Sequence, residues 1–234
     1  MLKYLVEAGF GARRQSVSAI KQGRVTVNGR AVESYTMPVY PGIDNIDCDG
    51  KPVKFKPNKT LVLMVNKPLD VLSTTRDDRG RRTVIDLLPE RYRSLGLYPA
   101  GRLDYDSTGL LILTNDGNLT YRLTHPRFEH EKEYIVTVNG KLGDADKEKL
   151  EKGLELEDGL TSPAILKEVP DAAYTYSITI HEGRHRQVKR MFASLGYEVK
   201  TLKRVRIGRL ELGDLAEGEI RKLTPAEIGK LLRR

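Results

Sequence analysis

The feature that most constrains the fold of this chain is a segment rich in lysine and proline, KPVKFKPNKT, which spans residues 51–60. Its two prolines and four lysines interrupt the hydrophobic patterns on either side, and such a composition favours an extended connection. We interpret it as a closing strand followed by a linker. The 234 residues are therefore predicted to form two domains, over residues 1–58 and 59–234.

Composition restricts the class of protein. Hydrophobic residues make up 39% of the chain, enough for a packed core, but the apolar runs fall far short of the roughly 20 residues that a membrane helix requires. We therefore expect no membrane association. The single cysteine, Cys48, cannot form an intramolecular disulfide bond, so we expect it to be a reduced core residue of a cytoplasmic protein.

Positive charge is concentrated in the first domain. Residues 1–60 contain ten lysines and arginines against five acidic residues, whereas the rest of the chain contains 30 against 27. An excess gathered in a small module is typical of proteins that bind a polyanion. The alternative is a solvated surface that happens to be basic.

Local patterns predict two helices and a hairpin in this first domain. Residues 2–6 have helical spacing, and residues 16–22 form a second helix that stops at Gly23. The sequence RVTVNGRAV alternates apolar and polar residues around Asn28-Gly29, which predicts a β-hairpin. Four cations lie at the two ends of the second helix, where they can follow a phosphate backbone with little base selectivity. These predicted RNA-binding residues are Arg13, Arg14, Lys21 and Arg24.

The longer second segment mixes strands and helices. The periodicity of its apolar residues predicts strands at 61–68, 109–115, 133–140 and 174–181, and helices at 144–153 and 187–195. The strands outnumber the helices and are too unevenly separated for a regular parallel sheet. We therefore predict an α+β fold with a largely antiparallel sheet.

A loop in this segment carries two acidic residues close together. In AGRLDYDSTGLLILTNDG, residues 100–117, Asp104 and Asp106 precede an apolar strand. A loop aspartate is most often a turn residue. If it is catalytic, a metal-dependent nuclease or a glycosidase that pairs Asp104 with Asp106 or Asp116 is an option. Four histidines without metal-ligand spacing argue against a zinc site, and no glycine-rich phosphate loop is present.

Two families resemble the chain. The sequence GFGARRQSVSAIKQGRVTVNGRAV, residues 9–32, is similar to the alpha-L RNA-binding domain known from ribosomal small-subunit protein four. Over nearly its whole length the chain resembles the RsuA/RluB family of ribosomal RNA pseudouridine synthases, and the motifs occur in the family's order. These motifs are NKPLDVLST, GRLDYDSTGLLILTNDG, HPRFEHEKEYIV, EGRHRQVKRMF and RVRIGRLELGDL.

The second resemblance implies an isomerase that converts uridine in structured RNA into pseudouridine. The N1–C1′ bond breaks, the uracil rotates while bound, and C5 bonds to C1′. The family's indispensable carboxylate corresponds to Asp104, which either attacks C1′ or removes a sugar proton. Asp106 is then expected to shape the loop, and Lys189 matches the basic residue that accompanies the carboxylate.

The resemblance also assigns residues to substrate binding. Tyr134 matches the active-site tyrosine, whose ring can stack on the flipped uracil and whose hydroxyl is a candidate for moving the C5 proton. Arg102 and Arg184 are expected to contact the substrate RNA. The Asn66-Lys67-Pro68 motif is interpreted as mostly structural.

The implied biochemistry is simple. We expect no metal and no cofactor, a monomeric protein, and ribosomal RNA or a pre-ribosomal particle as the partner. The sequences of the motifs slightly favour 23S over 16S RNA as the substrate. The alternative to an enzyme is a non-catalytic ribosome-assembly factor that binds RNA.

Overall fold

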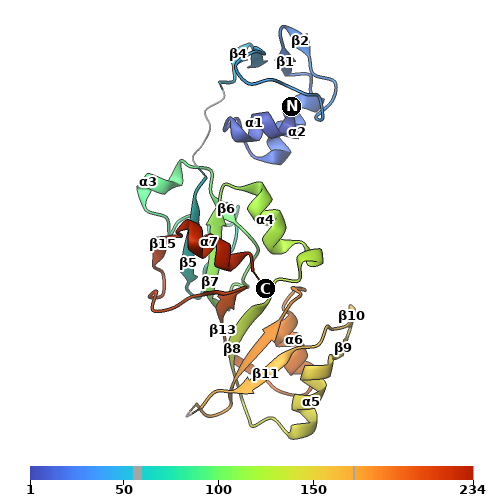
Figure 1. Cartoon of the computed structure of the whole chain (residues 1–234), viewed down its shortest axis with the longest axis vertical. Coiled ribbons are helices and arrows are strands. Elements are labelled where there is room, and N and C mark those ends of the chain that lie inside the picture. The colour runs from blue at the N-terminus through green and yellow to red at the C-terminus, as the bar shows by residue number, and fades with distance from the viewer. Residues whose placement is uncertain (55–59, 171, 234) are drawn as a thin grey trace. The chain divides into compact units, whose positions relative to one another are not determined.

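The computed structural model describes residues 1–54, 60–170 and 172–233. The chain divides into two compact units, Met1–Thr60 and Leu61–Arg234 (Figure 1). The domain boundary predicted between residues 58 and 59 lies outside the described residues. No helix in the described part of the chain is both long enough and apolar enough to cross a membrane.

The first unit packs two helices against a small antiparallel sheet of strand order β2-β1-β3-β4. Asn28 and Gly29 connect β1 to β2 with φ angles of 50° and 80°, the positive values that a tight hairpin turn requires, so the predicted hairpin is confirmed. Its elements are α1 (Leu2–Glu7), α2 (Arg13–Lys21), β1 (Val25–Val27), β2 (Arg30–Ala31), β3 (Ile46–Cys48) and β4 (Lys51–Pro52).

The core of this unit is apolar and includes the cysteine. Leu5 and Val25 are fully buried, and Ile20 and Cys48 pack with them. The second helix begins at Arg13, three residues before the predicted start, because the extended Ala12 lies at its N-terminal boundary. Two of the predicted RNA-binding arginines therefore lie within its first turn.

The second unit has an α+β fold, as predicted. Its elements are β5 (Val62–Lys67), α3 (Glu90–Arg93), β6 (Tyr98–Pro99), β7 (Thr108–Thr114), α4 (Gly117–Thr124), the 3-10 helix η1 (Pro126–Phe128), β8 (Lys132–Val138), α5 (Asp144–Lys152), β9 (Glu155–Leu156), β10 (Gly159–Leu160), β11 (Ile165–Glu168), β12 (Thr175–Ile180), α6 (Gln187–Ser194), β13 (Val199–Ile207), β14 (Leu210–Glu211), β15 (Ile220–Lys222) and α7 (Pro225–Leu231). The four predicted long strands correspond to β5, β7, β8 and β12.

Within the described residues, nine strands form one sheet. Its main order is β11-β12-β8-β13-β7-β5-β15, with β14 beside β13 and β6 beside β7. The pairing of β7 with β13 is parallel, and the other pairings described for this sheet are antiparallel. The predicted antiparallel character is therefore confirmed.

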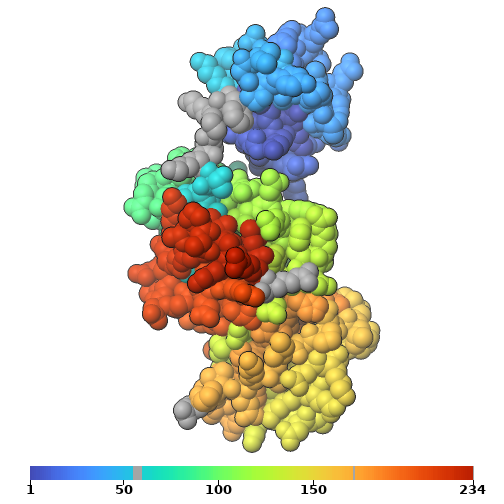
Figure 2. Space-filling view, viewed as in Figure 1, coloured from blue at the N-terminus to red at the C-terminus, as the bar shows by residue number. Residues whose placement is uncertain are grey.

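The centre of this sheet is buried on both faces because its strands are continuously apolar. Along β7, Leu111 and Leu113 face one core, which α5 and α6 help to cover, while Leu110 and Ile112 face another, which α4 and α7 help to cover. The space-filling view shows the C-terminal segment with β14, β15 and α7, in red, lying over this second core (Figure 2). Helix α7 starts with a capping box between Thr224 and Glu227.

Candidate active site

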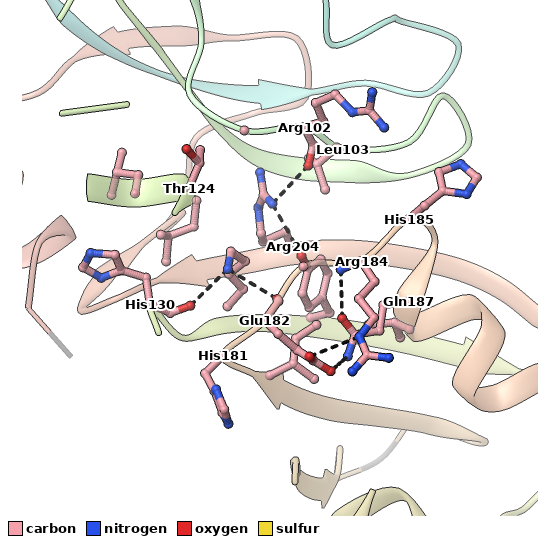
Figure 3. A pocket seen from close by; sticks show the side chains of 18 of the residues that line it. Arg102, Leu103, Thr124, His130, His181, Glu182, Arg184, His185, Gln187 and Arg204 are labelled. Carbon is pink, nitrogen blue, oxygen red and sulfur yellow. Dashed lines mark hydrogen bonds and ion pairs between the residues drawn. The ribbon is translucent and has the colours of Figure 1, made fainter. Parts of the chain in front are cut away.

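A pocket of about 590 Å³ opens in the second unit, where the loop before β7 meets β8, β13 and the segment before α6. The predicted residues Asp104, Tyr134, Arg102 and Arg184 all line it. Figure 3 shows the loop of Arg102 and Leu103 on one side of Arg204, and Glu182, Arg184 and Gln187 grouped on the other side. The pocket therefore collects side chains that are far apart in the sequence.

The backbone on both sides of Asp104 is held in place. The Ser73 hydroxyl donates to the Leu103 carbonyl at 2.8 Å and accepts from the Leu103 amide at 3.1 Å. The Leu103 side chain is buried in the core, and the Tyr105 carbonyl accepts from the Asp70 amide at 3.1 Å. Asp104 is thus presented by a loop that is fixed before the substrate binds.

The two loop carboxylates have opposite environments. The half-buried Asp104 carboxylate has no hydrogen bond or ion pair to any residue that the structure describes, and it faces the pocket. Asp106 is exposed and accepts from both terminal nitrogens of Arg186, at 3.0 and 2.9 Å. The Arg186 guanidinium holds the pKa of Asp106 well below its usual range, with Lys189 adding to the effect.

The position of Lys189 differs from the expectation. Its ammonium lies 2.8 Å from the Asp106 carboxylate and donates to the Asp106 carbonyl at 2.9 Å, so its ion-pair partner is Asp106 and not Asp104. Lys189 is also not among the residues that line the pocket in the described chain. In this loop Asp104 lines the pocket, whereas Asp106 meets Lys189 of α6 and Arg186 just before it. The observed contacts tie the loop to α6.

Tyr134 lies opposite Arg204 in the pairing of β8 with β13, and the residue is 8% exposed. The Arg204 guanidinium donates to the Leu110 carbonyl at 2.7 Å and lies 3.4 Å from both the Tyr134 hydroxyl and the Arg102 carbonyl. It therefore links three segments of the pocket wall. Gly109 permits the backbones of β7 and β13 to approach closely at Arg204, because a Cβ atom there would lie 2.2 Å from the Arg204 carbonyl oxygen.

Comparison with known proteins explains this architecture. The family profile described as RNA pseudouridylate synthase matches residues 61–194, and the S4 domain matches residues 2–42. The chain belongs to the RNA pseudouridylate synthase family. It is an isomerase with an N-terminal S4 RNA-binding domain. The nuclease and glycosidase alternatives are thereby set aside.

Similar proteins span almost the whole of this synthase. Ribosomal large subunit pseudouridine synthase B of Bacillus subtilis is 40% identical and aligns over 98% of this chain and 93% of its own. An uncharacterised RNA pseudouridine synthase of Aquifex aeolicus is also 40% identical and aligns over 99% of this chain and 92% of its own length. A crystal structure of a pseudouridylate synthase covers 98% of both chains at 35% identity, with a TM-score of 0.72.

Sequence reasoning missed two cations in the pocket of the synthase. Lys132 precedes Tyr134 by two residues on β8, so strand alternation was the signal that placed both on one face. Arg204 likewise follows Leu202 by two residues on β13, so strand alternation places it on the same face, and it is 3% exposed. The sequence of β13 did not indicate that a charged side chain would be buried there. Both side chains line the pocket.

The lysine of the Asn66-Lys67-Pro68 motif is fully buried behind the loop. Its ammonium donates to the carbonyls of Pro68 and Val71 at 2.8 and 2.9 Å, which supports a structural role. Burial lowers the pKa of Lys67 to about 8, against the opposing effect of the Asp70 and Asp104 charges. The Asp104 charge is thus near enough to act on the buried Lys67, and it acts on Arg186 as well.

This buried lysine predicts a pH dependence of stability. Because its pKa is lower in the folded chain than its ordinary value of 10.5, the unfolded chain holds more protons between about pH 8 and 10.5. The contribution of Lys67 to stability is therefore smallest below pH 8 and grows as the pH rises. Urea unfolding measures the free energy of unfolding of the wild type and of Lys67→Met. Between about pH 7 and 10, the value for the wild type should rise relative to that of the variant. Parallel pH profiles would contradict the prediction.

The two predicted substrate-binding arginines differ in how far they are engaged. Arg102 is exposed, its side chain has no partner among the described residues, and it points away from Arg204 (Figure 3). Arg184, by contrast, donates to Glu182 at 3.2 Å and to the Gly159 carbonyl at 2.7 Å, and it also contacts Asp158. Its guanidinium thus holds the β9–β10 hairpin, so a substrate contact of Arg184 stays a prediction.

The four predicted RNA-binding cations of the S4 domain also divide into two groups. Arg13, Arg14 and Lys21 are exposed and have no ion pair with any described residue. Arg24 instead makes a two-pronged ion pair with Asp49, with 2.8 Å from its Nε to the carboxylate. The first three residues therefore present unpaired charge to solvent, whereas the charge of Arg24 is largely neutralised.

Proposed function

We propose that this synthase converts a specific uridine of ribosomal RNA into pseudouridine, with 23S favoured over 16S RNA, and that Asp104 is the carboxylate that performs the chemistry. The observation that supports this most is the geometry of Asp104. Its backbone is fixed on both sides, while its carboxylate faces the pocket without a partner in the described chain. A group held in this way is available to a substrate atom.

The reaction needs an ionised carboxylate beside the sugar. Asp104 either bonds to C1′ as the N1–C1′ bond breaks or removes a sugar proton to give a glycal-like intermediate. In both routes the uracil leaves with the electron pair of the N1–C1′ bond and rotates. It then forms the new bond from C5 to C1′ as Asp104 either detaches from C1′ or returns the sugar proton. The C5 proton is then lost to a base while N1 gains a proton, so the product is an isomer of the substrate.

The surroundings of Asp104 support the assignment of the other roles. Tyr134 provides a largely buried ring in the wall of the pocket, on which the extruded uracil can stack. Arg102 provides a free cation at the mouth for the opened RNA strand. Lys189 and Arg186 act through Asp106 by holding the loop against α6.

The choice of RNA is supported by the relatives. The B. subtilis protein that is 40% identical is named for the large ribosomal subunit, and the S4 domain adds an RNA-binding module. We propose that the synthase acts as a monomer in the cytoplasm on 23S RNA, free or within a pre-ribosomal particle. Unpaired cations in the S4 domain supply affinity without reading bases, which leaves the choice of uridine to the pocket and to RNA structure.

Mapping pseudouridines in ribosomal RNA from cells with and without the gene tests this proposal. Deletion should remove pseudouridine from one or a few positions of 23S RNA and leave 16S RNA unchanged. The wild-type gene should restore the modification, and a gene encoding Asp104→Asn should not. Loss only in 16S RNA would refute the choice of subunit, and unchanged maps would refute ribosomal RNA as the substrate.

A further inference from the structure

A buried cation, Arg204, and a half-buried one, Lys132, lie in the pocket wall without an ion-pair partner among the described residues. Arg204 donates only to two carbonyls and a hydroxyl within the described chain, and its Nη2 is buried without any hydrogen-bond partner. Lys132 donates to the carbonyls of His130 and Glu182, at 3.1 and 3.4 Å, and likewise has no ion pair there. Both residues line the pocket, from the adjacent strands β13 and β8.

This arrangement is electrostatically costly in the empty pocket. A buried cation normally has a counter-ion, because removal from water penalises the charged form. The two charges also oppose each other: burial and, to a smaller extent, the nearby Arg204 together lower the pKa of Lys132 to about 8, against a smaller opposing effect of the Glu182 charge. The main-chain carbonyls offset only part of this cost. The pocket is therefore prepared for negative charge that arrives with the substrate.

The proposed reaction produces such a charge at one moment. When the N1–C1′ bond breaks, the uracil takes the bonding electron pair, and negative charge spreads over N1 and the two carbonyl oxygens. Asp104 cannot compensate this charge, because its carboxylate is anionic before the step and only neutral once it has bonded to C1′ or taken up the sugar proton. A fixed cation in a pocket that excludes water stabilises a developing anion far more than it would in solution.

We propose that Arg204, together with Lys132, stabilises the negative charge on the detached uracil while it rotates. This inference rests on the proposed function and assigns the handling of the base to one side of the pocket and the handling of the sugar to Asp104. The Arg204 guanidinium is well placed for this because it lies 5.9 Å from the centre of the Tyr134 ring, on which the base is proposed to stack.

The test compares two leaving bases. Single-turnover rates are measured on saturating ribosomal RNA fragments that carry either uridine or 5-fluorouridine at the mapped position. Fluorine makes the departing base a weaker base, so it needs less stabilisation by the protein. Consumption of the nucleoside is followed by digestion and chromatography, because the fluorinated base has no C5 proton to release.

Arg204→Met is expected to slow uridine conversion by about 100-fold and 5-fluorouridine conversion by clearly less, with RNA affinity nearly unchanged. Arg204→Lys, which keeps the charge, should recover part of the rate. Arg206→Met is the matched control on the same strand, because Arg206 pairs with Glu131 and Glu133 and does not line the pocket. It should affect both substrates equally and weakly.

Equal slowing of both substrates by Arg204→Met would overturn the inference. So would a loss of RNA affinity with a weaker salt dependence, because that result would assign the cations to a phosphate group. If Arg204→Met does not fold, Lys132→Met tests the inference instead, through the same comparison of how far uridine and 5-fluorouridine conversion are slowed. Absence of wild-type turnover would refute the proposed function, whereas wild-type turnover with a ratio that does not change in the variants would refute only this inference.

Discussion

Replacement of Asp104 by asparagine is expected to lower pseudouridine formation by about 1,000-fold or more while RNA binding persists or becomes tighter. The substitution keeps the size of the side chain and removes its charge and nucleophilicity. The carboxylate has no partner among the described residues, so its loss breaks no contact of the fold. Removing a negative charge from a site that binds phosphates also favours the RNA. Tritium release from uridine labelled at C5 measures the rearrangement.

Asp106→Asn is the matched control, with the same chemical change two residues away. It should reduce the rate by less than about tenfold, because exposed ion pairs contribute little energy and the loop is also held through Ser73 and Asp70. Substantial tritium release from the Asp104→Asn protein, together with an inactive Asp106→Asn protein, would reverse the assignment of the two carboxylates.

Replacing Arg13, Arg14 and Lys21 together by glutamine should weaken RNA binding by about 100-fold at 0.1 M salt and lower the salt-dependence slope by about 2 to 3. All three are exposed on α2 or at its ends, without a described ion pair, so each can neutralise a phosphate. The rate on saturating RNA should change much less, because the pocket is built within the second unit. Filter binding across a range of salt concentrations measures both quantities.

A charge-matched control is available on α5. Lys147, Lys149 and Lys152 pair with acidic residues of the same helix, so replacing them by glutamine removes the same charge without removing unpaired cations. This variant should bind RNA nearly as the wild type does. Equal losses in the two variants would show that net charge, and not the S4 domain, determines affinity.

Much of the fold could be predicted because its signals are local. The Asn28-Gly29 turn, the alternating β8 and β12, and the apolar stripe of α6 all depend on spacing within a few residues. α6 begins at Gln187 as predicted and ends one residue earlier, at Ser194. The short α3 and β6, by contrast, gave no recognisable period, since they contain only four and two residues.

The candidate site was less predictable because its partners come from distant segments. The family resemblance assigned the catalytic role to Asp104, but the sequence could not show which loop carboxylate would meet the cations at the start of α6, because that depends on how the loop turns. The contact of Arg186 with Asp106 spans 80 positions. Arg204 is an arginine in a strand with several other cations, and its burial follows only from its position opposite Tyr134.

The parallel pairing of β7 with β13 has a consequence for how the chemistry is aligned. Asp104 precedes β7, whereas the residues proposed to handle the base lie on β8 and β13, and the register joins the two halves of the sheet through two residue pairs, Lys203 with Thr108 and Arg204 with Gly109. In the proposed mechanism, separate parts of one sheet therefore contact the sugar and the base. Their distance is determined by how closely two backbones approach at Gly109. The alignment of bond cleavage with base rotation depends on a position that has no side chain.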